Sequence, residues 1–278
     1  MTTMRIEHTT RFRYAAEIGS SYNEARVVPA WLPRQRVLDS RVSITPVTWR
    51  SSYRDYWECD VTVFEVLQPH TSLTVAASSV VEVASSPPRG EKAGWEALEG
   101  PKLRDLLCEY LDNSAATAPP DALADFARDA SHRLGPDSTA RAICEYLHSE
   151  VRYVPGVTSV HSTAQDAWEG RSGVCQDMAQ LAIGALREIG IPARYVSGYL
   201  HPSRDASIGE TVEGESHAWI EWWSGEWTGF DPTNDREVGD HHVIVGRARE
   251  YRDIPPLAGV VAGATEDLDV TVKVTQTA

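Results

Sequence analysis

The chain has 278 residues, of which 42% are hydrophobic and 24% are charged. These shares are typical of folded globular proteins and exclude a disordered or fibrous chain. The sequence contains 26 Lys and Arg against 40 Asp and Glu, which gives a net charge of -14. Because this charge repels phosphate backbones and anionic membrane surfaces, we expect neither nucleic acid nor a membrane as a partner.

The amino terminus and the four cysteines indicate the compartment. No apolar segment of signal-peptide length follows MTTMRIEHTT, and no stretch approaches the roughly 18 apolar residues of a membrane span. The short paired spacings of zinc sites and disulfide frameworks are missing among Cys59, Cys108, Cys144 and Cys175. We therefore predict a cytoplasmic protein with free thiols.

The first 85 residues have the pattern of β structure. A first strand is predicted by the period-two pattern of Ile6, His8, Thr10, Phe12 and Tyr14. Further strands are predicted over residues 41–45, 56–67 and 72–83, the last two being rich in Val and Thr. Since no helical pattern intervenes, we predict an all-β domain over residues 1–85, either a sandwich or barrel-like.

A run of structure breakers follows, Ser85-Ser86-Pro87-Pro88-Arg89-Gly90, and predicts a linker over residues 86–99. The remainder, residues 100–278, is the predicted catalytic domain. Helical spacing of apolar residues recurs over 103–110, 123–130 and 142–147, with Ser138 as the expected N-cap of the third helix. We predict a fourth helix over 175–189, strands over 194–200, 217–223 and 227–230, and an exposed acidic loop over 202–215. Helices followed by an antiparallel sheet indicate an α+β fold.

Cys175 follows the glycine-containing turn Arg171-Ser172-Gly173-Val174 and stands at the start of the predicted fourth helix. The exposed N–H groups and positive dipole end of a helix N-terminus favour a thiolate and can hold an oxyanion. A cysteine on an apolar helix is more often a small buried hydrophobe. The other three cysteines, which lie inside predicted helices or strands, are better explained in that way.

A predicted hairpin brings a histidine and an aspartate together. A turn at Ser224-Gly225 pairs Trp223 with Glu226 and places His217 opposite position 232. Asp231 is then within two ladder positions, and cross-strand neighbours lie about 4.5–5.5 Å apart at Cβ. A carboxylate on one ring nitrogen raises the basicity of the other, as a base for a thiol requires. A strand-end histidine bonded to a carbonyl and a turn-starting aspartate are the ordinary alternatives.

Other aromatic and histidine residues near these motifs are given structural roles. Alternation along the strand puts Trp219 and Trp223 on the face of His217. Trp168 is expected to pack in the core rather than to donate a hydrogen bond to an oxyanion. The pair His241-His242 lacks the spacing of a metal site, so no metal is predicted.

At these residues the sequence resembles the bacterial transglutaminase-like family, which belongs to the papain-like cysteine enzyme superfamily. Asn23-Glu24-Ala25-Arg26 is similar to the β domain that precedes the core in this bacterial group. The core motifs occur in order between residues 150 and 258: Tyr153-Val154-Pro155-Gly156, Gly173-Val174-Cys175-Gln176-Asp177, the run 190–199, Ser216-His217-Ala218-Trp219, the run 229–234, Val245-Gly246-Arg247 and the run 251–256.

The resemblance implies a transglutaminase or papain-like core with helices packed on an antiparallel sheet. It places the nucleophile on Cys175, the base on His217 and the orienting acid on Asp231. Substrate preference is left open, because Met178 and Gln180 stand where an aromatic or a histidine is expected and residues 248–250 resemble an insertion. Four neighbouring residues are candidates for supporting roles: Gln176, Asp177, Trp168 and Trp219.

The favoured reaction is hydrolysis of an amide or peptide bond through a thioester, with a protein or peptide as substrate, because water is the default acceptor. Transamidation of protein glutamine shares every step up to the acyl-enzyme and is the enzymatic alternative. A non-catalytic peptide-binding module on the same fold is the alternative from another class. Since the calcium-binding loops of animal transglutaminases have no counterpart, no cofactor is predicted.

Overall fold

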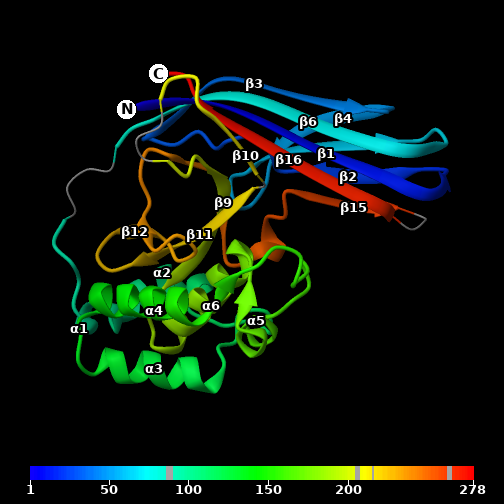
Figure 1. The fold of residues 1–278 in the computed structure, drawn as a ribbon. Helices are drawn as coiled ribbons and strands as arrows, with labels where there is room; N and C mark the ends of the chain where they lie inside the picture. Colours follow the sequence, from blue (N-terminus) through cyan, green and yellow to red (C-terminus); the bar gives the residue numbers. More distant parts are fainter. Residues whose placement is uncertain (86–89, 204–206, 215, 262–264) are drawn as a thin grey trace.

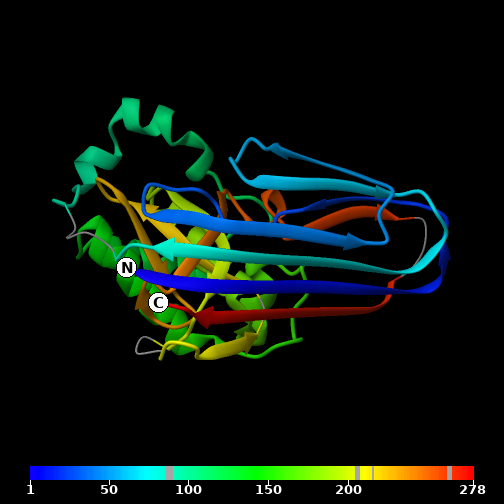
Figure 2. The same cartoon turned by 90° about the horizontal axis from the view of Figure 1, so that it is seen from above.

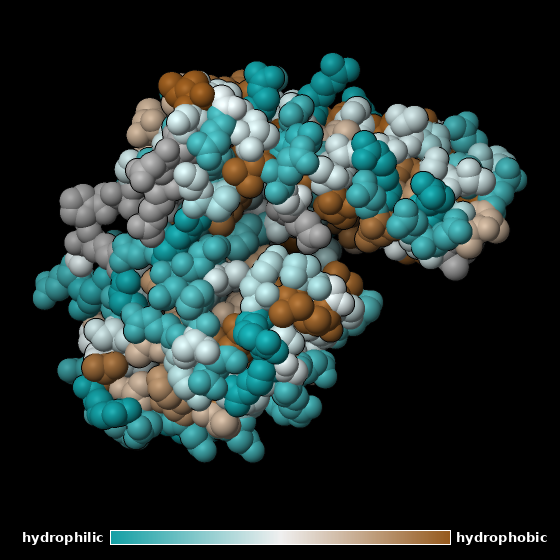
Figure 3. Space-filling view, viewed as in Figure 1, coloured by the Kyte–Doolittle hydropathy of each residue, from teal (hydrophilic) through white to brown (hydrophobic). Residues whose placement is uncertain are grey.

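The computed structural model describes residues 1–85, 90–203, 207–214, 216–261 and 265–278. Two sheets form an elongated sandwich, and a third sheet carries helices on one of its faces (Figure 1). We call the elongated sandwich the arm, and the third sheet with its helices the helical lobe. The surface has a notch between the arm and the helical lobe (Figure 3). A strand-rich region followed by a core of helices and antiparallel sheet confirms the predicted α+β class.

The sandwich consists of a five-stranded and a four-stranded sheet, in which all the strand pairs are antiparallel. The order in the first is β10 (Thr211–Gly214), β16 (Thr265–Gln276), β1 (Thr2–Ile18), β6 (His70–Val83) and β3 (Gln35–Thr45). The order in the second is β15 (Leu257–Val261), β2 (Ser21–Ala25), β5 (Asp60–Val66) and β4 (Trp49–Arg54). Figure 2 shows the long strands of the first sheet side by side.

The long strands β1 and β6 contribute to two hydrophobic cores. In the arm, Leu73 of β6 packs with Phe64 of the second sheet. At the other end, Ile6 and Val81 pack with Val243 of the third sheet. The alternation of β1 supplies buried side chains along nearly its whole length, so one strand face serves both cores. The first sheet is therefore also the cover of the third.

The third sheet is antiparallel, with the order β13 (Arg236–Glu237), β12 (Trp227–Asp231), β11 (His217–Trp223), β9 (Ala193–Leu200) and β14 (His242–Ala248). A short parallel pair joins β7 (Arg152–Tyr153) and β8 (Ser172–Gly173). The helices are α1 (Trp95–Leu98), α2 (Pro101–Leu106), η1 (Cys108–Tyr110), α3 (Asp121–Ser131), α4 (Pro136–Glu150), α5 (Ala164–Gly170), α6 (Cys175–Glu188) and η2 (Tyr251–Asp253).

Helix α6 is almost wholly enclosed, since every residue from Gln176 to Arg187 is buried. Helices α3, α4 and α5 pack against it on one side, and β9 and β11 on the other. Such enclosure suits a helix with little polar surface, and α6 is rich in Ala, Leu and Ile. Burial of the helix fixes the position of its first residue, Cys175.

Two local predictions were wrong. Helix α4 begins at Pro136 after Gly135, not at a cap on Ser138, because proline is pre-organised for the first helical position. The hairpin turn has one residue more than predicted, since Trp223 pairs with Trp227 rather than with Glu226. Within this turn Gly225 adopts a φ of 97°, in the left-handed region that favours glycine.

The arrangement of the strands differs from the predicted division of the chain into an N-terminal β domain and a catalytic domain. The predicted catalytic domain, residues 100–278, includes β10, β15 and β16, yet these strands complete the two sheets of the sandwich. Helix α1 lies in the predicted linker 86–99, and β10 lies in the predicted acidic loop 202–215. Residues 86–89, 204–206 and 215 of these two segments lie outside the described residues. In the described parts of the chain, no helix is both long and apolar enough to cross a membrane.

Candidate active site

Cys175 is the first residue of α6, and the single N-cap residue Val174 separates it from β8. Its side chain is partly exposed, whereas Cys59 and Cys144 are buried. Burial raises the pKa of the Cys59 thiol to about 12 and also raises the pKa of Cys144, so both stay protonated at neutral pH. Cys108 is exposed on the single turn η1. Cys175 is thus both partly exposed and located at the N-terminus of a long helix.

Asp177 fixes the turn in front of Cys175. Its Oδ2 accepts hydrogen bonds from the Val174 backbone N–H at 2.8 Å and from Thr158 Oγ1 at 2.6 Å. Gly173 leaves room for this side chain, because a Cβ there would lie 2.7 Å from Asp177 Oδ2. Burial raises the pKa of Asp177, although both hydrogen bonds act to lower it. Asp177 therefore has a structural position, and it ties the 154–162 loop to α6.

The predicted contact between His217 and Asp231 is present in the structure. His217 Nε2 lies 2.7 Å from Asp231 Oδ2, at the end where β11 begins and β12 finishes. Burial by itself lowers the pKa of His217, but hydrogen bonds with Asp231 and Cys175 outweigh it and raise the pKa to about 10. Because Nε2 is bound to Asp231, Nδ1 is the ring nitrogen left for the Cys175 thiol. The geometry favours a charged imidazole between a thiol and a carboxylate.

Asp231 is fully buried and held from several sides. Its Oδ1 accepts from the backbone N–H groups of Thr233 and Asn234, at 3.1 and 3.2 Å. Its Oδ2 accepts from Asn234 Nδ2 at 2.7 Å as well as from His217. Burial opposes ionisation, but these donors prevail and lower the pKa of Asp231. Asn234 ends the run 229–234, but the sequence alone predicts no role for it.

His242 is a second histidine beside Asp231. Its Nε2 lies 3.5 Å from Asp231 Oδ2, and its Nδ1 accepts from the Gly239 backbone N–H at 3.2 Å. An accepting Nδ1 carries no proton, so the hydrogen of this neutral ring is on Nε2, toward the carboxylate. Burial lowers the pKa of His242, in keeping with the neutral form. The spacing of His241 and His242 does not predict a metal site, and it does not show that His242 begins β14, the strand next to β9.

Trp219 separates the two histidines. Its ring lies 6.0 Å from that of His217 and 5.2 Å from that of His242, measured between centroids, and its side chain is fully buried. Gly198 makes this possible, because a Cβ there would lie 2.5 Å from the Trp219 ring. Among the described residues, Trp219 Nε1 has no hydrogen-bond partner. Trp219 therefore acts as a spacer that holds both imidazoles.

Two other candidates for supporting roles lie in the core. Trp168 belongs to the helix-side hydrophobic cluster, with the Arg171 guanidinium 3.9 Å above its ring. Gln176 is buried, and its Nε2 has no partner within the described part of the chain. Tyr195, which sequence reasoning did not single out, is buried near the thiol: burial first, then the charge of Cys175, raises its pKa. No local pattern marks Tyr195, because its position is set by the packing of β9 on α6.

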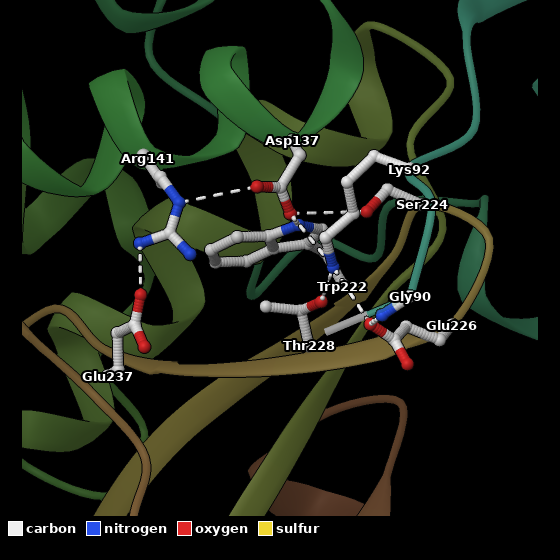
Figure 4. A network of polar contacts seen from close by, with 9 residues as sticks. All are labelled: Gly90, Lys92, Asp137, Arg141, Trp222, Ser224, Glu226, Thr228 and Glu237. Carbon is white, nitrogen blue, oxygen red and sulfur yellow. Dashed lines mark hydrogen bonds and ion pairs between the residues drawn. The ribbon is translucent and has the colours of Figure 1, made fainter. Parts of the chain in front are cut away.

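The turn of the hairpin is anchored to helix α4. Asp137, in the first turn of α4, accepts hydrogen bonds from Trp222 Nε1 at 3.0 Å and Ser224 Oγ at 3.2 Å. Arg141 lies one helical turn further on and donates to the other carboxylate oxygen at 3.3 Å. Figure 4 shows Asp137 at the centre of this network.

Lys92 adds a second anchor from the segment before α1. Its Nζ lies 3.5 Å from Asp137 Oδ1 and donates to Glu226 Oε1 at 3.2 Å and Thr228 Oγ1 at 2.8 Å. These contacts hold the turn between β11 and β12 (Figure 4). The hairpin that carries His217 and Asp231 is thereby fixed at the end opposite to these two residues.

The residues available to a metal ion are few. Over the described ranges, no three His, Cys, Asp or Glu side chains are grouped as a metal site would require. The histidines and the carboxylate around Trp219 are occupied with one another.

Comparisons with known proteins place the chain in a family. Residues 4–82 match the bacterial transglutaminase-like N-terminal region, and residues 123–232 match the transglutaminase-like superfamily. An uncharacterized protein of Mycobacterium leprae (strain TN) is 42% identical over 279 residues, covering 100% of both chains. The chain belongs to the transglutaminase-like superfamily.

Two further similarities were found, one to a relative in sequence and one to a solved structure. A protein-glutamine gamma-glutamyltransferase of Pseudomonas aeruginosa is 32% identical over 147 residues, which is 48% of this chain and 22% of that protein. The crystal structure of a candidate cysteine protease from Cytophaga hutchinsonii superposes with a TM-score of 0.75 and 18% identity, covering 100% of this chain and 99% of that one. The second likeness is one of fold. This transglutaminase-like chain is thus a cysteine enzyme of the papain-like type, as the sequence motifs predicted.

Proposed function

We propose that the protein hydrolyses amide or peptide bonds, with Cys175, His217 and Asp231 as its catalytic triad. The Cys175 thiolate attacks the carbonyl carbon, and the C–N bond breaks as His217 gives its proton to the departing amine. The product of this half is a thioester. Water then attacks the carbonyl carbon of the thioester while His217 takes a proton from the water. The C–S bond breaks, which releases the carboxylic acid and restores the Cys175 thiolate beside the charged His217.

The observation that carries the proposal is the 2.7 Å contact of His217 Nε2 with Asp231 Oδ2 beside a helix-terminal thiol. The carboxylate orients the ring, and it stabilises the imidazolium that pairs with a thiolate. The negative oxygen formed during attack needs donors. The backbone N–H groups in the first turn of α6 supply them, because the first N–H groups of a helix have no partner within it.

Transamidation is the second candidate reaction. The name of the Pseudomonas aeruginosa relative, a protein-glutamine gamma-glutamyltransferase, supports it. In that reaction an amine replaces water at the thioester, and all residues named above keep their roles. Hydrolysis is preferred here because no bound amine is needed, and because water reaches any site that is not closed. A protein or peptide is the proposed substrate in both cases.

The triad is tested by alkylation with iodoacetamide at neutral pH. Cys175 should react faster than Cys59, Cys108 and Cys144, and His217→Gln should slow only Cys175. Peptide mapping by mass spectrometry gives the four rates within one sample. Equal and slow labelling of all four thiols would favour the non-catalytic peptide-binding alternative and would contradict the triad.

The fate of the thioester is tested with a glutamine-containing peptide, incubated with and without a primary amine. Hydrolysis predicts a deamidated or cleaved product in both samples, absent in Cys175→Ala. An amine adduct that exceeds the hydrolysis product would instead establish transamidation. A library of peptides would then define the preferred residues on each side of the reacting bond.

A further inference from the structure

A pocket lies apart from the thiol, where the turn between β4 and β5 meets the third sheet. Its volume is about 320 Å³, in the range of small-molecule sites. The residues that line it include the aromatic side chains Trp31, Tyr56, Trp57 and Tyr110, together with Arg247. Arg247 belongs to the motif Val245-Gly246-Arg247, to which the proposed reaction gives no role. The pocket is therefore a candidate binding site separate from Cys175.

Two lining residues of the pocket, Arg194 and Arg247, belong to an ion cluster around the buried Glu221. Glu221 Oε2 accepts from Arg194 Nε at 2.7 Å and from Arg247 Nε at 2.9 Å. The two arginines overcome the effect of burial and lower the pKa of Glu221. The Arg194 guanidinium also lies 3.8 Å above the Trp227 ring, so it is fixed on two sides. Two cations thus share one carboxylate.

Arg247 has donors to spare. Only its Nε is bonded to Glu221, and within the described part of the chain its Nη1 and Nη2 make no hydrogen bond. Its side chain is 25% exposed, and it lines the pocket. A guanidinium held by one edge presents a rigid pair of N–H groups, which matches the two oxygens of a carboxylate.

The turn over residues 55–59, which carries Tyr56 and Trp57, is held in place by hydrogen bonds. Arg26 Nε donates to Asp55 Oδ2 at 2.9 Å, and Asp55 Oδ1 accepts from the backbone N–H groups of Trp57 and Cys59 at 3.0 and 2.9 Å. Inside this turn Glu58 has a φ of 60°, in the left-handed region that is costly for a residue with a side chain. Since Arg26 belongs to the Asn23-Glu24-Ala25-Arg26 motif, motifs from both ends of the chain build one pocket.

The charges at the rim limit the kind of anion. Glu58 and Glu109 line the pocket, and the Tyr56 hydroxyl donates to Glu109 Oε1 at 2.9 Å. Arg54, the third lining cation, is paired with Asp60 at 3.4 Å. Two rim carboxylates repel a phosphate dianion more strongly than a singly charged carboxylate. The rings, in turn, offer apolar area to the body of a ligand.

We propose that this pocket binds a monocarboxylate with an apolar body, its two oxygens on the Nη1 and Nη2 groups of Arg247 and its body against Tyr56 and Trp57. Strand β11 carries Glu221 four residues after His217, about 13 Å along the strand at ~3.3 Å per residue. Through the pair of Arg247 with Glu221, the pocket is connected to the strand that carries the triad histidine. It does not depend on which reaction occurs at Cys175.

The test compares an acid with its amide. N-acetyl-Ala-Tyr with a free carboxylate and the same dipeptide with a carboxamide are titrated into the protein by calorimetry, with 3-phenylpropionate as a small acid without a peptide bond. We expect the free acid to bind at least ~10-fold more tightly than the amide, as charge-assisted pairs with arginine do. If 3-phenylpropionate binds equally well, a small free acid suffices. If only the dipeptide acid binds, the pocket takes a peptide carboxyl terminus.

Variants distinguish Arg247 from the rest of the protein. Arg247→Met should weaken acid binding at least ~10-fold, Arg247→Lys should restore part of it, and Tyr56→Ala should weaken both acids. The control is Arg11→Met, which removes an exposed arginine paired with Asp269 on the far sheet and should change nothing. The iodoacetamide rate of Cys175 should stay at its wild-type value in all four. Equal binding of acid and amide, binding by neither, or full binding by Arg247→Met would overturn the proposal.

Discussion

The two faces of the third sheet differ in chemistry although the same strands supply both. On the helix side, Ile220 and Trp222 of β11 are fully buried in the apolar cluster around α6. On the opposite face, His217, Trp219 and Glu221 alternate with them. The period of two in a strand places successive side chains on opposite faces. One strand thus stabilises the fold with one set of residues, and with the other it supplies the triad histidine and the carboxylate that holds Arg194 and Arg247.

The face opposite the helices also carries the buried charge. Asp231 and Glu221 are both buried there, and neighbouring cations or donors lower the pKa of each. Burying ionised groups opposes folding even when they are paired. The apolar face offsets this cost, so substitutions on the two faces should separate stability from activity.

The largest effect is expected for Asp231→Asn. An asparagine keeps the shape but no longer stabilises the His217 imidazolium, so the turnover of a peptide substrate should fall by roughly 100-fold or more, as it does in other triads. The melting temperature should change far less than for a core cavity. Activity and melting curves on the same preparation give the comparison. Full activity in Asp231→Asn would remove the carboxylate from the mechanism.

On the apolar face, Ile220→Ala should cost about 2–5 kcal/mol of unfolding free energy, because it leaves a cavity beneath α6. The activity per folded molecule should remain close to that of the wild type. Urea titration measures the first quantity, and activity at low temperature measures the second. A large loss of activity with unchanged stability would mean that stability and activity do not depend on separate faces of the sheet.

A smaller effect is expected at the anchor of the hairpin. Asp137→Asn removes the charge that Trp222, Ser224 and Lys92 face and should cost about 1–3 kcal/mol. The matched control is Asp129→Asn, whose exposed pair with Arg133 should be worth less than ~1 kcal/mol. Both are measured by urea unfolding. Equal costs for the two variants would show that the network of Figure 4 contributes no more stability than an exposed ion pair.

The pH dependence is the most delicate expectation. The pKa of His217 is raised from 6.5 to about 10 in the folded protein, so the folded state holds a proton that the unfolded state releases above pH 6.5. This contribution to stability is complete below pH 6.5 and is lost as the pH rises toward about 10. The stability difference between wild type and His217→Gln should therefore shrink from pH 6 to pH 10. A difference that grows with pH would contradict the charged imidazole.

The residues of the candidate site could be predicted from the sequence because their signals are local. Strand β11 begins at His217 and ends at Trp223, as predicted, and α6 begins at Cys175. A hairpin constrains its two strands so strongly that an error of one residue in the turn left His217 in contact with Asp231. Motif order supplied the link from Cys175 to the hairpin, which no local pattern contains.

The parts that were missed depend on contacts between distant segments. His242 reaches Asp231 because β14 pairs with β9 on the far side of the sheet from β12. Arg247 meets the 55–59 turn, which joins β4 to β5, only when this end of the second sheet packs against the third. The predicted division into residues 1–85, 86–99 and 100–278 followed composition, which changes at the breaker run. Composition carries no information on strand pairing such as β1 with β16.

The pairing of β16 with β1 has a consequence for how the chain folds. Met4 lies opposite Gln276, and Thr3 and Ala278 share backbone hydrogen bonds. Until β16 has been synthesised, β1 has one unpaired edge, which can pair with other strands. Pairs so distant in sequence are slow to form. The helical lobe is therefore synthesised, and has time to collapse, before the sheet that covers it can close.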